Sequence, residues 1–320
     1  MDILLITPAP PGSRAGNRTT ATRWAGFLQD AGHQVRVSLS DDGGPADLLI
    51  ALHAWRSAPA IEAFAVRCPP VPRIVVLTGT DLYRFQHEEP ERTLAGMAAG
   101  QRLIGLHHRV ADDLPEFLHP RLRLVLQSAV PLSRRPPPDT GSFEVCVIGH
   151  LRAEKDPLRA AWAVRGLPEA SRLTVVQAGK AHDAKHEAMA MSEQQQNPRY
   201  RWRGEIPHWQ VRRLLARSRL MVISSRMEGG ANVVSEACVS GTPVLASRIP
   251  GNVGLLGDDY PGYFDVEDTV GLRALLLRAE QDAGFLDRLG QHVRRLAPSF
   301  LPAAEADALL SVVRELSDPG

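Results

Sequence analysis

Residues 224–237 read Ser-Ser-Arg-Met-Glu-Gly-Gly-Ala-Asn-Val-Val-Ser-Glu-Ala and follow the apolar run Leu220–Ile223. This order predicts a buried strand, a glycine turn and a helix. Gly229 and Gly230 let the backbone turn and approach a ligand closely, and the first N–H groups of the helix point at that ligand. We therefore expect an anion-binding site at this turn.

Two carboxylates flank the turn. Glu228 lies on the loop, and Glu236 lies inside the predicted helix, roughly 9 Å along its axis from Gly230 at about 1.5 Å per residue. A carboxylate accepts hydroxyl protons and repels phosphate, so we interpret the pair as a clamp on a sugar nucleotide, with the diphosphate between them. The alternative is an ordinary strand-to-helix connection with solvated glutamates.

The spacing from Glu228 to Glu236, with the two glycines and Asn232 inside it and Gly-Thr-Pro-Val at 241–244 after it, resembles the donor site of family 4 glycosyltransferases of GT-B fold. In that family the first glutamate contacts the hexose and the second contacts the ribose. The resemblance implies those roles here, with the donor also bound by Gly229, Gly230, Ala231, Asn232 and Val233.

Length and composition favour a globular protein with two domains. The chain has 320 residues, 44% hydrophobic and 23% charged, with a formal net charge of +1, which argues against a general nucleic-acid or membrane-binding field. Cys68, Cys146 and Cys238 have no metal or redox spacing, so we expect a reducing, cytoplasmic location. We expect no leader, because the N-terminus has no basic-then-apolar segment, and no membrane span, because no apolar run approaches about 20 residues.

Apolar runs alternate with helical patterns along the chain. Continuous runs predict parallel strands covered on both faces, at 3–6, 35–39, 47–52, 73–77, 102–106 and 122–126, and again at 143–148, 172–177, 199–202, 219–223 and 243–246. A proline-dense segment, 131–142, separates the two sets. Helical patterns at 268–297 and 303–316 finish the chain.

The predicted fold class is therefore α/β, and the resemblance implies GT-B: two Rossmann-like, doubly wound parallel-sheet domains facing across a cleft. We predict an acceptor-binding domain at 1–135, a donor-nucleotide domain at 142–300 and a C-terminal helix within 301–320. In the GT-B fold that helix often returns to the first domain.

The loop after the first strand, residues 7–20, contains glycines and opens a helix, which Asn17 or Thr19 would cap. Two arginines beside a helix N-terminus form a candidate oxyanion pocket. The alternative is a solvated arginine pair. The predicted acceptor-binding residues of this loop are Ser13, Arg14, Gly16, Asn17 and Arg18.

Two further loops follow strands in the first half. His53, at the end of the third run, suits an acid, a base or a hydrogen-bond donor, and its alternative is a packed histidine. Thr78-Gly79-Thr80-Asp81 resembles the family's His-Gly-Thr-Asp loop with threonine in place of histidine. A hydroxyl is no base at neutral pH, so Thr78 would position substrate. Arg84 completes the predicted acceptor residues.

In the second half, Gly-His-Leu-Arg-Ala-Glu-Lys-Asp at 149–156 resembles a family loop whose basic residues hold the donor diphosphate, which implies that role for Arg152 and Lys155. The turn at 203–207 resembles the family's base-binding turn, with Gly204 and Ile206 as main-chain contacts, although a plain strand-to-helix turn explains it equally well. We expect no metal. The His182 and His186 pair indicates a solvated helix rather than a ligand set.

The N-terminal motifs 7–18, 49–54 and 77–84, with 149–157 and 249–257, are similar to those of the selenosugar synthases of selenoneine biosynthesis. This resemblance implies a UDP-sugar donor, with UDP-N-acetylglucosamine expected, and selenophosphate as acceptor, without a cofactor. Glu228, His53, Arg152 and Lys155 are then the predicted catalytic residues. Two alternatives remain: a retaining transfer of a hexose to a hydroxyl, and a sugar-nucleotide-binding module without turnover.

Overall fold

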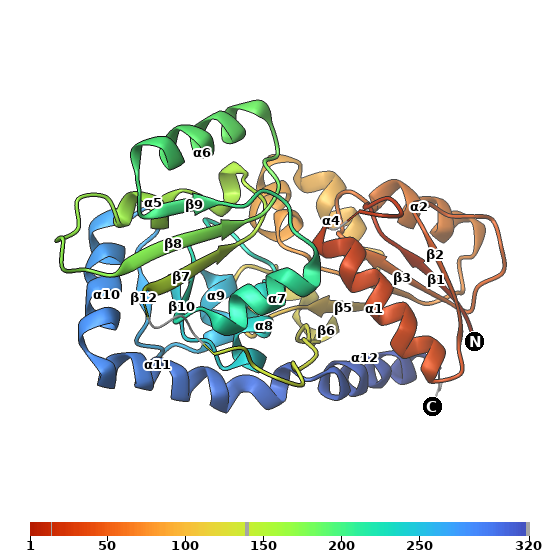
Figure 1. Cartoon of the computed structure of the whole chain (residues 1–320). Coiled ribbons are helices and arrows are strands. Elements are labelled where there is room, and N and C mark those ends of the chain that lie inside the picture. The colour runs from red at the N-terminus through yellow and green to blue at the C-terminus, as the bar shows by residue number, and fades with distance from the viewer. Residues whose placement is uncertain (14, 138–140, 318–320) are drawn as a thin grey trace. The chain divides into compact units, whose positions relative to one another are not determined.

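The computed structural model of the protein describes residues 1–13, 15–137 and 141–317. The chain divides into two compact units, drawn in Figure 1. The second unit is formed by Ser128–Met227 and Ala231–Leu301. The first unit is formed by three separate pieces of chain: Met1–Gln127, Glu228–Gly230 and the chain from Pro302 onward.

The first unit contains a parallel sheet of six strands in the order β2-β1-β3-β4-β5-β6. The strands are β1 (Asp2–Ile6), β2 (Gln34–Ser38), β3 (Leu48–Leu52), β4 (Arg73–Val76), β5 (Arg102–Gly105) and β6 (Leu122–Leu124). The α-helices are α1 (Gly16–Asp30), α2 (Ala58–Arg67), α3 (Gln86–Glu88), α4 (Pro90–Ala98) and α12 (Pro302–Ser317). A π-helical turn, η1 (Asp81–Phe85), and two 3₁₀ segments, η2 (Val110–Asp112) and η3 (Glu116–Arg121), complete it.

Both faces of this sheet are covered by helices. Successive strand residues point to opposite faces, and here both sets are buried, which explains the continuous apolar runs. Ile3 and Ile50 pack with Trp24 of α1 and Leu309 of α12 on one face. On the other face the strands pack against α2, α4 and the η2–η3 segment. The prediction of a doubly wound sheet is confirmed.

The last helix, α12, packs against α1 in the first unit. The carboxylate of Glu305 is buried and accepts hydrogen bonds from Arg23 Nε (2.6 Å), Arg23 Nη2 (2.9 Å) and Trp24 Nε1 (2.7 Å). At the far end of α12, Ser317 Oγ lies 3.1 Å from Met1 Sδ. The two ends of the described chain therefore meet within one unit.

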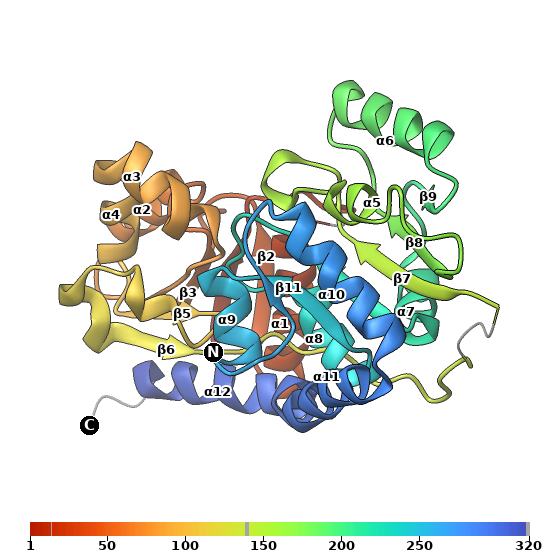
Figure 2. The ribbon, with the colours of Figure 1, turned by 90° about the vertical axis from the view of Figure 1, so that its left-hand side faces the viewer.

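The second unit has a parallel sheet in the order β12-β11-β10-β7-β8-β9. Its strands are β7 (Phe143–Ile148), β8 (Leu173–Ala178), β9 (Tyr200–Trp202), β10 (Leu220–Ile223), β11 (Val244–Ser247) and β12 (Tyr263–Phe264). Its α-helices are α5 (Arg159–Ala163), α6 (Ala184–Gln196), α7 (His208–Arg217), α8 (Asn232–Ser240), α9 (Pro250–Leu256), α10 (Thr269–Gln281) and α11 (Ala283–Leu296). Two 3₁₀ segments are η4 (Ala153–Lys155) and η5 (Ala297–Phe300). Figure 2 shows α6 beside the edge strand β9, which it contacts.

Three local predictions differ from the structure. The helical pattern at 268–297 forms two helices, because Asp282 ends α10 and caps α11 by accepting from the Phe285 N–H (2.9 Å). The two-residue strand β12 is too short to give a sequence pattern. Neither Asn17 nor Thr19 caps α1: Ala15 holds the cap position without a side-chain bond, and the Thr19 hydroxyl donates back to Ala15 O (3.3 Å).

Among the described residues, no single helix is long and apolar enough to cross a membrane, although Ala283–Phe300 and Pro302–Ser317 together meet that test of length and composition.

Candidate functional site

Each sheet has one point where its strand order reverses, between β1 and β3 in the first unit and between β7 and β10 in the second. Open α/β sheets bind ligands at the carboxyl ends of the strands beside such a point. In the second unit the loops in question are 149–156 after β7 and 224–231 after β10. The sequence analysis predicted that these two loops bind the donor diphosphate.

Hydrogen bonds join these two loops. Ser224 Oγ donates to Asp156 O (2.8 Å), and the Arg226 N–H donates to Glu154 O (2.8 Å). Ser224 is only 2% exposed, so it ties the loops together from within the unit. The loop that contains Arg152 and Lys155 is therefore held beside the start of the predicted donor turn.

Arg152 has a cationic group with unused hydrogen-bonding capacity. Its Nε is buried and has no hydrogen-bond partner among the described residues, and the nearest carboxylate oxygen, on Glu154, is 4.0 Å away. The side chain as a whole is 42% exposed. A guanidinium N–H without a hydrogen-bond partner can donate to an anionic oxygen.

Helix α8 begins at Asn232, and Ala231 in the cap position makes no side-chain hydrogen bond to it. The N-terminus of α8 therefore carries no acidic cap and favours an anion through its dipole. Glu236 lies in the middle of this helix. Its Oε1 lies 3.1 Å from Nε2 of His208, the first residue of α7, and this hydrogen bond raises the pKa of that imidazole.

The turn at 203–207 directly precedes His208. Gly204 has φ +63°, a conformation that favours glycine, and its carbonyl accepts from the Gly179 N–H (2.8 Å). One lone pair of that oxygen remains for another donor. Through His208, the predicted base-binding turn and the predicted ribose carboxylate, Glu236, lie next to each other.

The structure gives a reason for glycine at residues 229 and 230, while the predicted close approach of a ligand stays a prediction. Neither has a positive φ. A Cβ on Gly229 would lie 2.2 Å from Thr78 C, and a Cβ on Gly230 would lie 2.5 Å from Leu106 Cβ. These glycines are required by the close approach of the chain's own segments within the first unit, to which Glu228–Gly230 belongs. Glu228 itself is 8% exposed.

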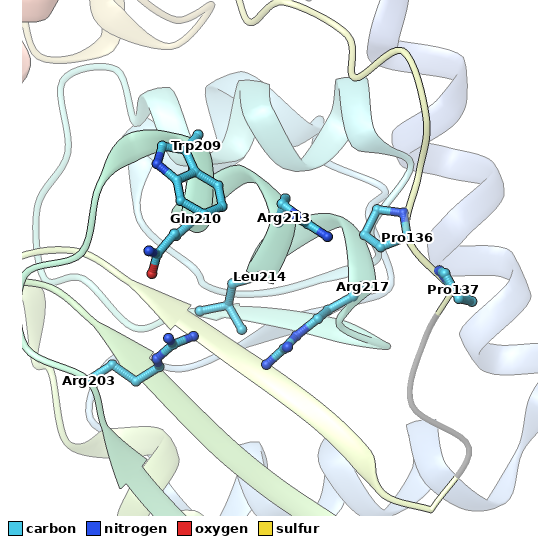
Figure 3. A pocket seen from close by; sticks show the side chains of 8 residues that line it. All are labelled: Pro136, Pro137, Arg203, Trp209, Gln210, Arg213, Leu214 and Arg217. Carbon is cyan, nitrogen blue, oxygen red and sulfur yellow. The ribbon is translucent and has the colours of Figure 1, made fainter.

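A groove on α7, shown in Figure 3, was not predicted. It has a volume of about 470 Å³ and is lined by Pro136, Pro137, Arg203, Trp209, Gln210, Arg213, Leu214 and Arg217. Trp209 is 57% exposed, and Arg217 pairs with Glu144 (2.8 Å). None of the predicted site residues lines this groove.

In the first unit, the loop after β1 leads into α1. Arg14 lies outside the described residues. Ser13 Oγ accepts from the Ala15 N–H (3.1 Å), and Gly16 and Asn17 form the first turn of α1. Arg18, in the same turn, has a buried Nη1 without a hydrogen-bond partner among the described residues. Like Arg152, it can bind an anion.

Asp81 holds the shape of the loop after β4. Its carboxylate is fully buried and accepts from the backbone N–H groups of Gly79 (2.8 Å), Thr78 (3.0 Å), Ala54 (3.0 Å) and Leu82 (3.2 Å). Four such bonds occupy both oxygens. The structure thus gives Asp81 a structural role, and direct binding of an acceptor by this residue stays a prediction.

His53 has φ +72°, a strained conformation for a residue with a side chain, and is 2% exposed. Its Nε2 lies 2.8 Å from Thr80 Oγ1, and its Nδ1 accepts from the Arg56 N–H (3.2 Å). Burial lowers the pKa of His53, although Asp81 opposes this shift. Both ring nitrogens are engaged, so the structure supports a positioning role, and acid or base catalysis by His53 stays a prediction.

Arg84 lies on η1 with its side chain 45% exposed. It pairs with Glu88 (2.9 Å), and its guanidinium lies 5.2 Å from the centre of the Phe85 ring. Of the three arginines predicted to bind the acceptor, Arg18 has the buried unpartnered nitrogen, and Arg84 is already paired.

One pair of residues was missed. Tyr83 Oη lies 2.7 Å from Nε2 of His107, which follows β5 and is fully buried. The available signal was the histidine's position just beyond a predicted strand, the same position that singled out His53. Near His182, Asp183 caps α6 by accepting from the His186 N–H (2.8 Å), which gives Asp183 a structural role.

Several solved structures share this fold. Anabaena Alr3699/HepE, in complex with UDP and glucose, matches with 14% identity and a TM-score of 0.76 over 98% of this chain and 100% of that chain. Sucrose-phosphate synthase from Thermosynechococcus elongatus matches with 15% identity and a TM-score of 0.78 over 99% of both chains. The pneumococcal O-GlcNAc transferase GtfA, with UDP and GlcNAc, matches with 15% identity and a TM-score of 0.62 over 94% of this chain and 60% of that chain.

The curated proteins contain no match to this sequence. The structural likenesses agree with the two parallel sheets in confirming the predicted GT-B fold. The sequence profile of the family "Glycosyl transferases group 1" matches residues 132–295, just over half of the chain, and includes both loops at the switch point of the second sheet. The protein is therefore a member of the glycosyl transferases group 1 family.

Proposed function

We propose that this glycosyltransferase is a family 4 member that uses a UDP-sugar, with UDP-N-acetylglucosamine as the expected donor. The observation that supports the donor site is the pair of hydrogen-bonded loops at the switch point of the second sheet. They bring the Nε of Arg152, which has no hydrogen-bond partner among the described residues, beside the turn that leads into α8, whose cap position is held by Ala231. Cationic and dipolar groups there would stabilise the charge that grows on the leaving diphosphate.

The remaining donor contacts follow from the same geometry. Glu236 would accept ribose hydroxyls, and Glu228 would accept hexose hydroxyls. The neighbouring structures support a UDP-sugar, since HepE is solved with UDP-glucose and GtfA with UDP and GlcNAc. We propose that no metal assists the transfer, so chelation of divalent ions is expected to leave the rate unchanged.

For the acceptor, we propose selenophosphate. The selenium attacks the anomeric carbon and forms the C–Se bond, the C–O bond to UDP breaks, and its electron pair leaves with UDP. Hydrolysis of the Se–P bond then releases phosphate. Two points support this acceptor: the resemblance to the selenosugar synthases, and the lack of an available base at His53 and Asp81 in the acceptor loops.

The acceptor loops offer no available general base at His53 or Asp81. His53 has both ring nitrogens engaged, and Asp81 has both oxygens occupied by N–H groups. An alcohol acceptor normally needs a base, whereas selenophosphate is already an anionic and polarisable nucleophile. Catalysis can then depend on orientation and charge.

The test is incubation of the protein with UDP-N-acetylglucosamine or UDP-glucose and selenophosphate, followed by mass spectrometry for a selenium-bearing sugar. Inorganic phosphate in place of selenophosphate is the control. A selenium product with release of UDP supports the proposal. Transfer to alcohols without any selenium product would replace it with hexosyl transfer to a hydroxyl, and UDP-sugar binding without turnover would indicate a binding module.

The Arg18→Ala variant tests the acceptor side separately. Loss of one charged hydrogen-bond donor is expected to raise the KM for selenophosphate by about tenfold or more, at roughly 1.5–3 kcal/mol per bond to a charged group. The KM for the UDP-sugar should stay the same. Arg201→Ala, at an exposed arginine on β9, is the matched control. Unchanged selenophosphate kinetics in Arg18→Ala would remove Arg18 from the pocket.

A further inference from the structure

Two buried histidines flank the loop after β4 in the first unit. His53 follows β3, and His107 follows β5, and these strands are the two neighbours of β4 in the sheet. The exposed fractions of the two residues are 2% and 0%. Each ring reaches a hydroxyl on the loop between them: His53 reaches Thr80 (2.8 Å) and His107 reaches Tyr83 (2.7 Å).

The hydrogen bonds at the other ring nitrogen fix the tautomer. A backbone N–H donates to Nδ1 in both rings, from Arg56 to His53 (3.2 Å) and from Arg109 to His107 (3.2 Å). A nitrogen that accepts an N–H carries no proton, so the proton of each neutral ring is on Nε2. Burial lowers the pKa of both rings, that of His107 to about 4, which keeps them neutral.

This tautomer decides the role of the two hydroxyls. A hydroxyl donates one hydrogen bond and accepts two. Because each Nε2–H donates to its hydroxyl, the proton of that hydroxyl is left to bind something else. Neither the Thr80 hydroxyl nor the Tyr83 hydroxyl has another hydrogen-bond partner among the described residues, and both residues are half-buried rather than fully enclosed.

Two further observations show that these donors are permanent and fixed. Burial, with a contribution from Asp113, raises the pKa of Tyr83, so the phenol keeps its proton at any working pH. The four N–H bonds to Asp81 hold the backbone of the loop that carries Thr80 and of the start of η1, which carries Tyr83. Preorganised donors of this kind are typical of substrate-binding sites.

We propose that the hydroxyls of Thr80 and Tyr83 donate hydrogen bonds to oxygen atoms of the acceptor substrate. His53 and His107 are then positioning residues that direct the two hydroxyl protons toward this substrate. This inference rests on the proposed glycosyl transfer and identifies an acceptor that offers at least two hydrogen-bond-accepting oxygen atoms. Selenophosphate meets this requirement, and the role of the hydroxyls does not depend on that choice.

The kinetic test uses Tyr83→Phe and Thr80→Val, which remove only the hydroxyls. Loss of one neutral hydrogen bond, about 0.5–1.5 kcal/mol, is expected to raise the acceptor KM roughly 2- to 13-fold in each variant. The UDP dissociation constant, measured by calorimetry, should not change. Thr80→Ser keeps a hydroxyl and is expected to raise the acceptor KM less than Thr80→Val does. Each variant must first show a wild-type circular dichroism spectrum.

The positioning role needs its own measurements. His107→Gln keeps an N–H donor and is expected to retain most activity, whereas His107→Leu should raise the acceptor KM as Tyr83→Phe does. In ¹⁵N-labelled protein, NMR at pH 7 should show the proton of both rings on Nε2. Protons on Nδ1, or acceptor KM values within twofold of wild type in both Tyr83→Phe and Thr80→Val, would overturn this inference while leaving the transfer itself intact. Wild-type protein without transfer to any acceptor would instead overturn the proposed function, and this inference with it.

Discussion

Replacement of Glu305 by alanine should destabilise the first unit strongly. This carboxylate is fully buried, whereas the side chain of its partner Arg23 is 18% exposed. Truncation removes three hydrogen bonds at once and leaves the indole N–H of Trp24, which is buried, without this acceptor. Removing one member of a buried ion pair costs about 3–5 kcal/mol. Glu305→Gln keeps an acceptor oxygen but loses the charge, so its loss should be smaller.

The same helix provides a matched control. Glu315 pairs with Arg102 (2.7 Å) and Arg123 (2.8 Å), but its side chain is 30% exposed. Exposed pairs contribute about 0.2–1 kcal/mol, so Glu315→Ala should have a small effect. Urea unfolding followed by far-UV circular dichroism measures both losses, and thermal unfolding should show a shift of about 2–4 °C per kcal/mol. Equal losses of unfolding free energy in the two variants would show that burial of Glu305 does not determine its contribution to stability.

Three further predictions concern Glu236, His208 and Gly79. Glu236→Ala should weaken UDP binding about tenfold or more in calorimetry, since a hydrogen bond to a charged group contributes roughly 1.5–3 kcal/mol, and an unchanged dissociation constant would place Glu236 outside the donor site. The pKa of His208 should lie above its ordinary 6.5 in an NMR titration and return toward it in Glu236→Gln. Because the folded pKa is raised, this pair stabilises the fold below pH 6.5 and loses its effect as pH rises through the folded pKa. Gly79→Ala should lower the free energy of unfolding more than Gly12→Ala: both have positive φ (+121° and +79°), but only the first Cβ meets backbone, at 2.7 Å from Gly229 N. Similar losses in both variants would contradict the close approach.

The fold was predictable because its determining features are local. Buried parallel strands are continuous apolar runs, so the eleven predicted runs correspond to β1–β11. The strand order cannot be obtained this way, because pairing joins segments that are distant in sequence, such as β10 with β7. The switch points, which identify the loops beside the expected ligand sites, could therefore be located only from the sheet topology.

Residue types and loop positions could be predicted for the site, whereas hydrogen-bond partners could not. The sequence placed His53 at a strand end, but its tautomer depends on the Arg56 N–H. Asp81 is part of a recognisable motif, yet its four backbone donors come from both its own loop and the segment after β3. Gly229 is explained by Thr78, which lies about 150 residues away in sequence.

The composition of the first unit has a consequence for synthesis of the chain. Its hydrophobic core takes Leu309, Val312 and Val313 from α12, near the end of the chain. A ribosome-bound chain that has emerged only as far as the second sheet would still expose the face of the first sheet that α12 covers. The first unit is therefore completed only after the second sheet has been synthesised, and loss of α12 by proteolysis would damage the core built around residues 1–127.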